Sequence, residues 1–275
     1  MMTSSPAAEL LAEIRKQGPL VHSITNNVVT NFTANVLLAI GAAPAMVDIV
    51  GESGMFAQVA NGLLVNLGTP APEQREASFE AVTGANAAGT PWVLDPVAIG
   101  ALPIRTELAK KLADMNPAAI RGNASEIRAL AGAGAGGRGV DSTDAIDDGV
   151  EEFMRLAREK ETVVAVSGPE DFITDGIRIL RVKNGDVLLT KVTGGGCALG
   201  SLIAAFIAVR GEASILEAVA SAHVVYGVAA ERAAAGGVGS GTFAVKLLDA
   251  LYELTPEDVS ENERVYEETI AGAAQ

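Results

Sequence analysis

Short apolar segments alternate with amphipathic ones along most of the chain, and this alternation predicts a βαβα order. Runs of mostly apolar residues without a period of two are typical of strands buried on both faces of a parallel sheet. The intervening stretches carry apolar residues every three or four positions, which predicts helices covering those faces. We expect strands at residues 20–24, 45–47, 63–67, 92–94, 118–120 and 162–166, and helices that include residues 30–40, 72–88 and 104–115.

The pattern changes after residue 171. The segments FIT, IRILRV and VLLTKV lie within residues 172–192 and are separated by Asp175-Gly176 and Asn184-Gly185. Such dipeptides are strong hairpin signals, so we expect an antiparallel edge of the sheet here. Beyond Cys197 the chain reads as three or four helices to its end. Because no repeat and no long linker interrupts this order, we expect a single domain over residues 1–275.

Composition narrows the class of protein. Hydrophobic residues make up 49% of the 275 positions and charged residues 20%, which is enough apolar surface for a large core. A formal charge of −14 disfavours nucleic acid and anionic membranes as partners. No apolar run is long enough to suggest a membrane span, and the first residues do not resemble a secretory signal. With one cysteine and no sign of export, the expected location is the cytoplasm.

The segment VTGGGCALG, residues 192–200, is the first candidate for chemistry. Consecutive glycines allow successive backbone N–H groups to converge, and the helix that follows adds unpaired donors and a partial positive charge. Thr193, Gly194, Gly195 and Gly196 therefore form a candidate anion hole with Cys197. The alternative of equal weight is a tight turn whose glycines only permit close packing.

Cys197 is the one thiol, and it begins the predicted helix. A helix start lowers the pKa of a thiol, so we expect a nucleophile, a base or an oxidation sensor there. The alternative is a small buried hydrophobic residue.

The segment RGNASEI, residues 121–127, follows a short strand and begins a helix. Ligands of open α/β sheets bind at this carboxyl edge, so Arg121 is a candidate for phosphate binding, and Asn123 and Glu126 for magnesium through water. Asn123 is also a good helix cap with Glu126 as its capping-box partner, and both interpretations can hold together.

The segment VLDPVAIG, residues 93–100, places Asp95 at the end of another buried strand. Its carboxylate is well placed for a metal, although an Asx turn also explains it. His22 and His223 are far apart in sequence, so a zinc site is not expected. We expect His223 to be an ordinary helix residue and His22 to orient a loop, although a Cys-His hydrolase remains an alternative.

The glycine-rich segment GAGAGGRG, residues 132–139, matches the G-x-G-x-x-G sequence of dinucleotide-binding proteins but lacks the structural context of that motif. The segment before it reads as a helix, whereas the fingerprint requires a strand there. We therefore expect a surface loop.

Several segments in one order resemble the hydroxyethylthiazole kinase family of the ribokinase-like superfamily. They are residues 22–46, NLGTP, VLDPVAIG, RGNASEI, VTGGGCALG and GSGTF, and the resemblance covers roughly residues 10–255. It implies a three-layer α/β sandwich with a mostly parallel sheet and no separate lid. It also implies ATP-dependent, magnesium-dependent phosphorylation of the primary hydroxyl of 4-methyl-5-(2-hydroxyethyl)thiazole in thiamine salvage.

The resemblance also implies roles for individual residues. Those bordering the thiazole would be Met46, Asn26, Asn27, Gly68 and Gly194. Those at ATP would be Arg121, Ser167, Asn123, Thr193, Gly195 and Gly196. Asp95 and Glu126 would act at the magnesium ion.

Cys197 would take the place of the superfamily's usual aspartate base, as it does in thiazole kinases. It would orient the substrate hydroxyl and accept its proton. Gly195 stands where the family usually has threonine or a similar residue.

A homotrimer with sites at the subunit interfaces is implied as well, since no insertion supplies a lid. The alternatives are an ATP-dependent NAD(P)H-hydrate dehydratase, another vitamin-precursor kinase of this superfamily, and a binding protein of kinase descent without catalysis.

Overall fold

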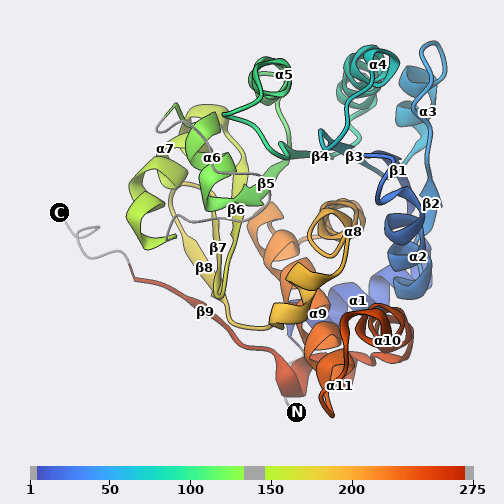
Figure 1. Ribbon diagram of the computed structural model, residues 1–275, viewed down its shortest axis with the longest axis vertical. Coiled ribbons are helices and arrows are strands. Elements are labelled where there is room, and N and C mark those ends of the chain that lie inside the picture. Colours follow the sequence, from blue (N-terminus) through green and yellow to red (C-terminus); the bar gives the residue numbers. More distant parts are fainter. Residues whose placement is uncertain (1–4, 133–145, 270–275) are drawn as a thin grey trace.

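One mixed sheet organises the molecule (Figure 1). The computed structural model describes residues 5–132 and 146–269. Within these residues the strand order is β2-β1-β3-β4-β5-β6-β7-β8-β9. The strands are β1 (Leu20–Ile24), β2 (Ala43–Ala45), β3 (Gly62–Asn66), β4 (Trp92–Asp95), β5 (Ala119–Asn123), β6 (Val163–Ser167), β7 (Asp171–Thr174), β8 (Ile179–Val182) and β9 (Val265–Glu267).

The strands from β2 to β6 are parallel, and β7, β8 and β9 continue the sheet in antiparallel pairs. Successive side chains of a central strand point to opposite faces of the sheet. Val163 and Ala165 belong to one core cluster, while Val164 and Val166 belong to the other. Burial on both faces explains why the central strands read as continuous apolar runs.

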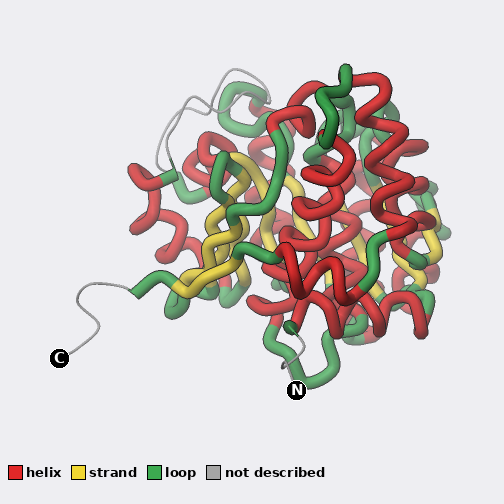
Figure 2. Tube along the Cα trace, turned by 90° about the horizontal axis from the view of Figure 1, so that it is seen from below, coloured by secondary structure: helices red, strands yellow, loops and turns green. Residues whose placement is uncertain are grey.

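Helices cover both faces of the sheet (Figures 1 and 2). One core cluster is built on α1 (Pro6–Gln17), α2 (Thr30–Ile40), α8 (Cys197–Ala208), α9 (Ile215–Ala234), α10 (Ser240–Glu253) and α11 (Pro256–Asn262). The other is built on α3 (Ser53–Val59), α4 (Pro72–Ala88), α5 (Pro103–Ala113), α6 (Ala124–Leu130) and α7 (Val150–Lys160). The first helix, α1, packs against α9 and α11 from the far end of the chain. The expected three-layer arrangement is confirmed.

The bounds of β1, α2 and α4 agree with the sequence prediction, and most other strands differ by one to three residues at an end. Both helices stop at a glycine in the left-handed conformation, Gly41 and Gly89, whose backbone N–H caps the last turn. The strand expected at 45–47 lies at Ala43–Ala45 instead.

Two expectations for the later part of the chain are wrong. The segment VLLTKV forms a 3-10 helix at Val187–Lys191, capped by the Asp186 side chain, rather than a strand. The Asn184-Gly185 dipeptide therefore closes no hairpin. The side chain of Asn184 is buried, donates to Glu231 and to the Asn262 carbonyl, and accepts from the backbone of Arg264.

The antiparallel edge itself is confirmed, because Asp175-Gly176 connects β7 to β8. Its last strand, β9, comes after α11 and was not expected, since the prediction placed only helices beyond Cys197.

Of the glycine-rich segment, residues 133–139 lie outside the described residues. In the described part of the chain, no helix combines the length and the apolar character needed to cross a bilayer.

Candidate active site at the carboxyl edge of the sheet

A chain of hydrogen bonds crosses the carboxyl ends of five neighbouring parallel strands. The participating side chains, in spatial order, are Asn26, Asn66, Asp95, Arg121 and Ser167. Each lies at the end of its strand or within two residues of it, from β1 through β3, β4 and β5 to β6. The register of the sheet sets their spacing, because Asn66 is the direct partner of Asp95 across β3 and β4. Because parallel strands end at the same edge of the sheet, residues separated by more than a hundred positions in sequence lie together here.

The centre of this chain is a buried ion pair. Arg121 Nη1 lies 3.3 Å from Asp95 Oδ2, and the two side chains are 8% and 0% exposed. The second terminal nitrogen of the Arg121 guanidinium, Nη2, donates to Ser167 Oγ at 2.9 Å. Burial raises the pKa of Asp95, while the Arg121 charge and the Asn66 amide favour its ionised form. Asp95 therefore takes part in an ion pair, and the alternative of an Asx turn is not among the hydrogen bonds of its side chain in the described part of the chain.

Glu126 occupies the turn beside this ion pair. Its Oε1 accepts from the backbone N–H of Ala98 at 2.8 Å, and its Oε2 from that of Asn123 at 2.9 Å. Asn123 Oδ1 in turn accepts from the Glu126 backbone, so the expected capping box is present at the start of α6. Burial and the nearby Asp95 charge raise the pKa of Glu126 to about 7. A bound cation would lower that pKa and hold the carboxylate ionised.

These residues suit a magnesium ion held largely by water and phosphate. Within residues 5–132 and 146–269, no three His, Cys, Asp or Glu side chains cluster closely enough to form a complete protein cage. Asp95 Oδ1 is buried and has no hydrogen-bond partner among the described residues, which leaves one carboxylate oxygen available. Magnesium is commonly bound through one or two carboxylates together with waters and substrate phosphates, so Asp95 and Glu126 fit it.

The glycine turn before α8 faces the same region. Gly194 has φ +92°, a left-handed conformation that favours glycine, and Gly195 donates its N–H to the Val192 carbonyl at 3.0 Å. The next two N–H groups, those of Gly196 and Cys197, have no partner among the described residues. A Cβ added at Gly196 would lie 3.5 Å from Arg121 Nη2. Two free donors therefore lie close to a guanidinium, as an anion site requires.

Cys197 is mostly buried at this turn, and its sulfur accepts from Asn26 Nδ2 at 3.7 Å. The expectation of a lowered pKa is wrong: burial and the Asp95 charge raise the pKa of the thiol to about 11. The start of a helix alone does not produce a thiolate where solvent is excluded and a carboxylate is near. At neutral pH only about one thiol in ten thousand is ionised at that pKa.

The residues expected at the acceptor substrate lie just after β1, β2 and β3 and in the glycine turn. Asn26 is buried, whereas Asn27 is exposed and donates its backbone N–H to Thr69 Oγ1. A Cβ on Gly68 would lie 2.6 Å from Asn26 Nδ2, so only glycine allows this approach. Met46 is half-buried directly after β2, at the outer end of the row, and Thr193 is exposed in the glycine turn. Sequence reasoning missed Asn66, whose signal was an asparagine ending a buried strand in NLGTP.

The two histidines take part in other contacts. His22 Nε2 lies 2.6 Å from the Val47 carbonyl, so this side chain orients the loop after β2 as expected. His223 Nδ1 pairs with Asp171 Oδ2 at 2.7 Å on the buried side of α9. Neither is hydrogen-bonded to Cys197 in the described part of the chain, which removes the support for a Cys-His hydrolase.

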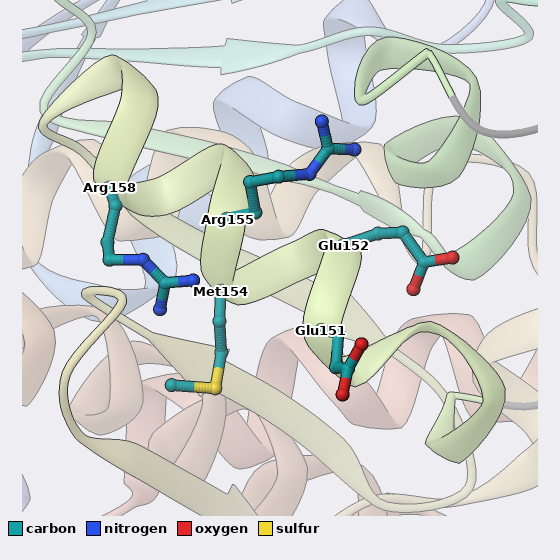
Figure 3. A pocket seen from close by; sticks show the side chains of 5 residues that line it. All are labelled: Glu151, Glu152, Met154, Arg155 and Arg158. Atoms are coloured by element: carbon teal, nitrogen blue, oxygen red, sulfur yellow. The ribbon is translucent and has the colours of Figure 1, made fainter.

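A surface pocket lies elsewhere, along α7 (Figure 3). Its lining side chains come from a single helix and fan out in different directions, so no polar groups converge in it. They are Glu151, Glu152, Met154, Arg155 and Arg158. The carboxyl edge of the sheet remains the candidate active site.

Comparisons with known proteins find similarity over nearly the whole chain. The model of the hydroxyethylthiazole kinase family matches residues 11–257. A hydroxyethylthiazole kinase of Clavibacter sepedonicus is 58% identical over 94% of this chain and 94% of its own length. The solved structure of a hydroxyethylthiazole kinase from Pyrococcus horikoshii OT3 matches with a TM-score of 0.87 and 37% identity, over 96% of this chain and 99% of that one.

A ribokinase-like superfamily protein from Enterococcus faecalis V583 matches with a TM-score of 0.63 at 10% identity, over 93% of this chain and 91% of that one. At this identity the match shows the fold alone, and it confirms the ribokinase-like architecture.

Proposed function

The chain belongs to the hydroxyethylthiazole kinase family, and from this premise we propose that it phosphorylates the primary hydroxyl of 4-methyl-5-(2-hydroxyethyl)thiazole with ATP in thiamine salvage. One observation carries the chemistry: the free N–H groups of Gly196 and Cys197 lie beside Arg121, next to the carboxylates Asp95 and Glu126. Phosphoryl transfer requires positioning and charge stabilisation above all, and this arrangement supplies both.

Different residues along the sheet edge bind ATP, the transferring phosphoryl group and magnesium. Arg121 and Ser167, with Asn123 nearby, form the ATP side, and the turn from Thr193 to Cys197 receives the transferring phosphoryl group on its backbone donors. Magnesium, when bound through Asp95 and Glu126, supplies charge neutralisation at the phosphates. All of these roles rest on one sheet, and we propose that residues 1–275 act as a single domain in the cytoplasm.

The acceptor alcohol occupies the opposite end of the site. Met46, Asn26, Asn27, Gly68 and Gly194 border the thiazole, which brings the hydroxyl next to Cys197. Because its raised pKa keeps the thiol protonated, Cys197 acts mainly by orienting the hydroxyl. The hydroxyl proton then leaves late, to a phosphate oxygen or to water, which suits a loose transition state in which the attacking oxygen gains little bonding before the phosphoryl group has left ADP.

Substitutions at Cys197 test both the reaction and this role. We expect Cys197→Ala to keep kcat within about tenfold of the wild type, because a group that is almost never ionised gives up little general-base catalysis. We expect Cys197→Asp to raise kcat, because the nearby Asp95 would lift its pKa towards neutrality and make it a better base. ADP release is measured with magnesium-ATP and a panel of vitamin-precursor alcohols.

Two outcomes of that assay, and one of a separate incubation of hydrated nicotinamide cofactor with ATP, are informative. A fall of about 10²-fold or more in Cys197→Ala would show that the thiol supplies general-base catalysis. Absence of ADP release from every alcohol contradicts the kinase and leaves a non-catalytic binding protein. Turnover of hydrated nicotinamide cofactor would favour the dehydratase, which the family comparisons do not favour.

We propose a homotrimer in which a neighbouring subunit covers the acceptor end. Apolar side chains are exposed beside Asn27 and on the adjacent helices α2 and α10; they include Val28, Leu38, Val245 and Tyr252. Exposed apolar side chains favour association with another protein surface. Active enzyme should sediment at three times the chain mass. A monomer that keeps full activity would contradict the proposal.

A further inference from the structure

Asn66 lies between the two halves of the site and is 4% exposed. Its Oδ1 accepts from Asn26 Nδ2 and from the Gly68 backbone N–H, both at 3.0 Å. Its Nδ2 donates to Asp95 Oδ2 at 2.7 Å. The oxygen therefore faces the acceptor end and the nitrogen faces the cation end.

Only a carboxamide satisfies these contacts together. A carboxylate offers acceptors alone when ionised, and a hydroxyl is too short to reach both directions from one Cβ. The amide cannot flip either, because flipping would bring its NH₂ against two donors and its oxygen against Asp95. One orientation is fixed by the chemistry of the neighbours.

The pairing of the strands also fixes the positions of Asn26, Asn66 and Asp95 relative to one another. Asn66 is paired with Asp95 in the register of β3 and β4, and β1, which precedes Asn26, pairs with β3 on its other side. Asn26 in turn contacts the Cys197 sulfur. Displacing the Asn66 side chain would thus release Asn26 on one side and Asp95 on the other.

We propose that Asn66 is the positioning residue that sets the acceptor pocket and the cation-binding carboxylate in register for phosphoryl transfer. It touches neither substrate: it acts through Asn26 and Gly68 at the alcohol, and through Asp95 at the cation. This inference rests on the proposed kinase function and assigns to the NLGTP segment a role of its own.

The test uses the full-length enzyme with magnesium-ATP and the thiazole alcohol. In Asn66→Ala we expect kcat to fall by about tenfold or more, with a rise in the KM for the alcohol and a shift in the half-saturating magnesium concentration. Asn66→Asp keeps the acceptor towards Asn26 but loses the donor to Asp95. It should therefore shift the magnesium dependence while changing the KM for the alcohol less than Asn66→Ala does.

A matched control separates positioning from folding. Asn184 is similarly buried and also donates to a carboxylate, that of Glu231, but its hydrogen-bond partners within the described residues all lie outside the site. Asn184→Ala should lower thermal stability and leave the alcohol KM and the magnesium dependence unchanged. In the double variant Asn26→Ala/Asn66→Ala, the alcohol KM should rise no further than in Asn26→Ala alone.

Two results would overturn the inference. If Asn66→Ala lowers stability as Asn184→Ala does while the alcohol KM and the magnesium dependence stay at wild-type values, Asn66 is only structural. If the wild type itself releases no ADP, the proposed kinase function fails, and the role of Asn66 fails with it.

Discussion

Replacing Arg121 with methionine should abolish detectable phosphoryl transfer and lower the free energy of unfolding by about 3–5 kcal/mol. The stability loss follows from Asp95, which is fully buried and would be left without its partner charge. The activity loss follows from the ATP side, where the guanidinium lies beside the free N–H groups of Gly196 and Cys197. Removing a single preorganised donor from such a site costs about 10²–10³ in kcat, and Arg121 carries a full charge as well.

A second substitution distinguishes the two effects. In Arg121→Met/Asp95→Asn the two charges of the buried ion pair are removed together, so much of the stability should return while activity stays absent. Urea unfolding measures the free energy, and ADP release measures activity. Recovery of activity in the double variant, or an Arg121→Met enzyme with wild-type kcat, would contradict the role of Arg121 at the phosphates.

Gly195→Ala should disable the glycine turn as this chain builds it, although the resemblance implies threonine or a similar residue here in the family. A Cβ at this position would lie 2.2 Å from the Leu189 carbonyl oxygen, so the backbone has to move. That movement displaces the free N–H groups of Gly196 and Cys197, and we expect kcat to fall by about 10²–10³. The KM for the alcohol should change less, since the loss concerns the transferring phosphoryl group.

The matched control for this substitution is Gly241→Ala. A Cβ at Gly241 has no neighbour within 4 Å, and the residue lies inside α10, where alanine is the better helix former. This variant should keep wild-type kcat and at least wild-type stability. Circular dichroism and steady-state kinetics compare both proteins. Full activity in Gly195→Ala would show that the turn serves packing rather than anion binding.

The sequence predicted the sheet well where burial on both faces dominates. The strand at residues 20–24 and the helices at 30–40 and 72–88 have the expected bounds, because apolar periodicity and the glycine caps act locally. The prediction failed at Val187–Lys191, where β propensity is overridden by tertiary contacts of Asn184 and by the Asp186 cap. Strand β9 is short and exposed, and its three residues are too few to show an alternation of apolar and polar positions that would predict a strand.

The candidate site was predictable to a similar extent. Knowing that parallel strands end at one edge is sufficient to bring Asp95, Arg121 and Glu126 together. The environment of Cys197 was not predictable in this way, because sequence shows the start of a helix but neither the exclusion of solvent nor the charge of Asp95. Asn66 was missed for a related reason: an asparagine after a strand usually indicates a turn, and its two-sided bonding appears only in three dimensions.

The packing of α1 has a consequence for biosynthesis. This helix packs on α9 and α11, which follow it in the chain by about two hundred residues or more. During synthesis its partners leave the ribosome long after it does, so the apolar side chains of α1 are not covered by them until then. Contacts of such long sequence separation slow folding, and the nascent chain exposes apolar surface during that time. Apolar surface exposed in this way is what chaperones that act during synthesis bind.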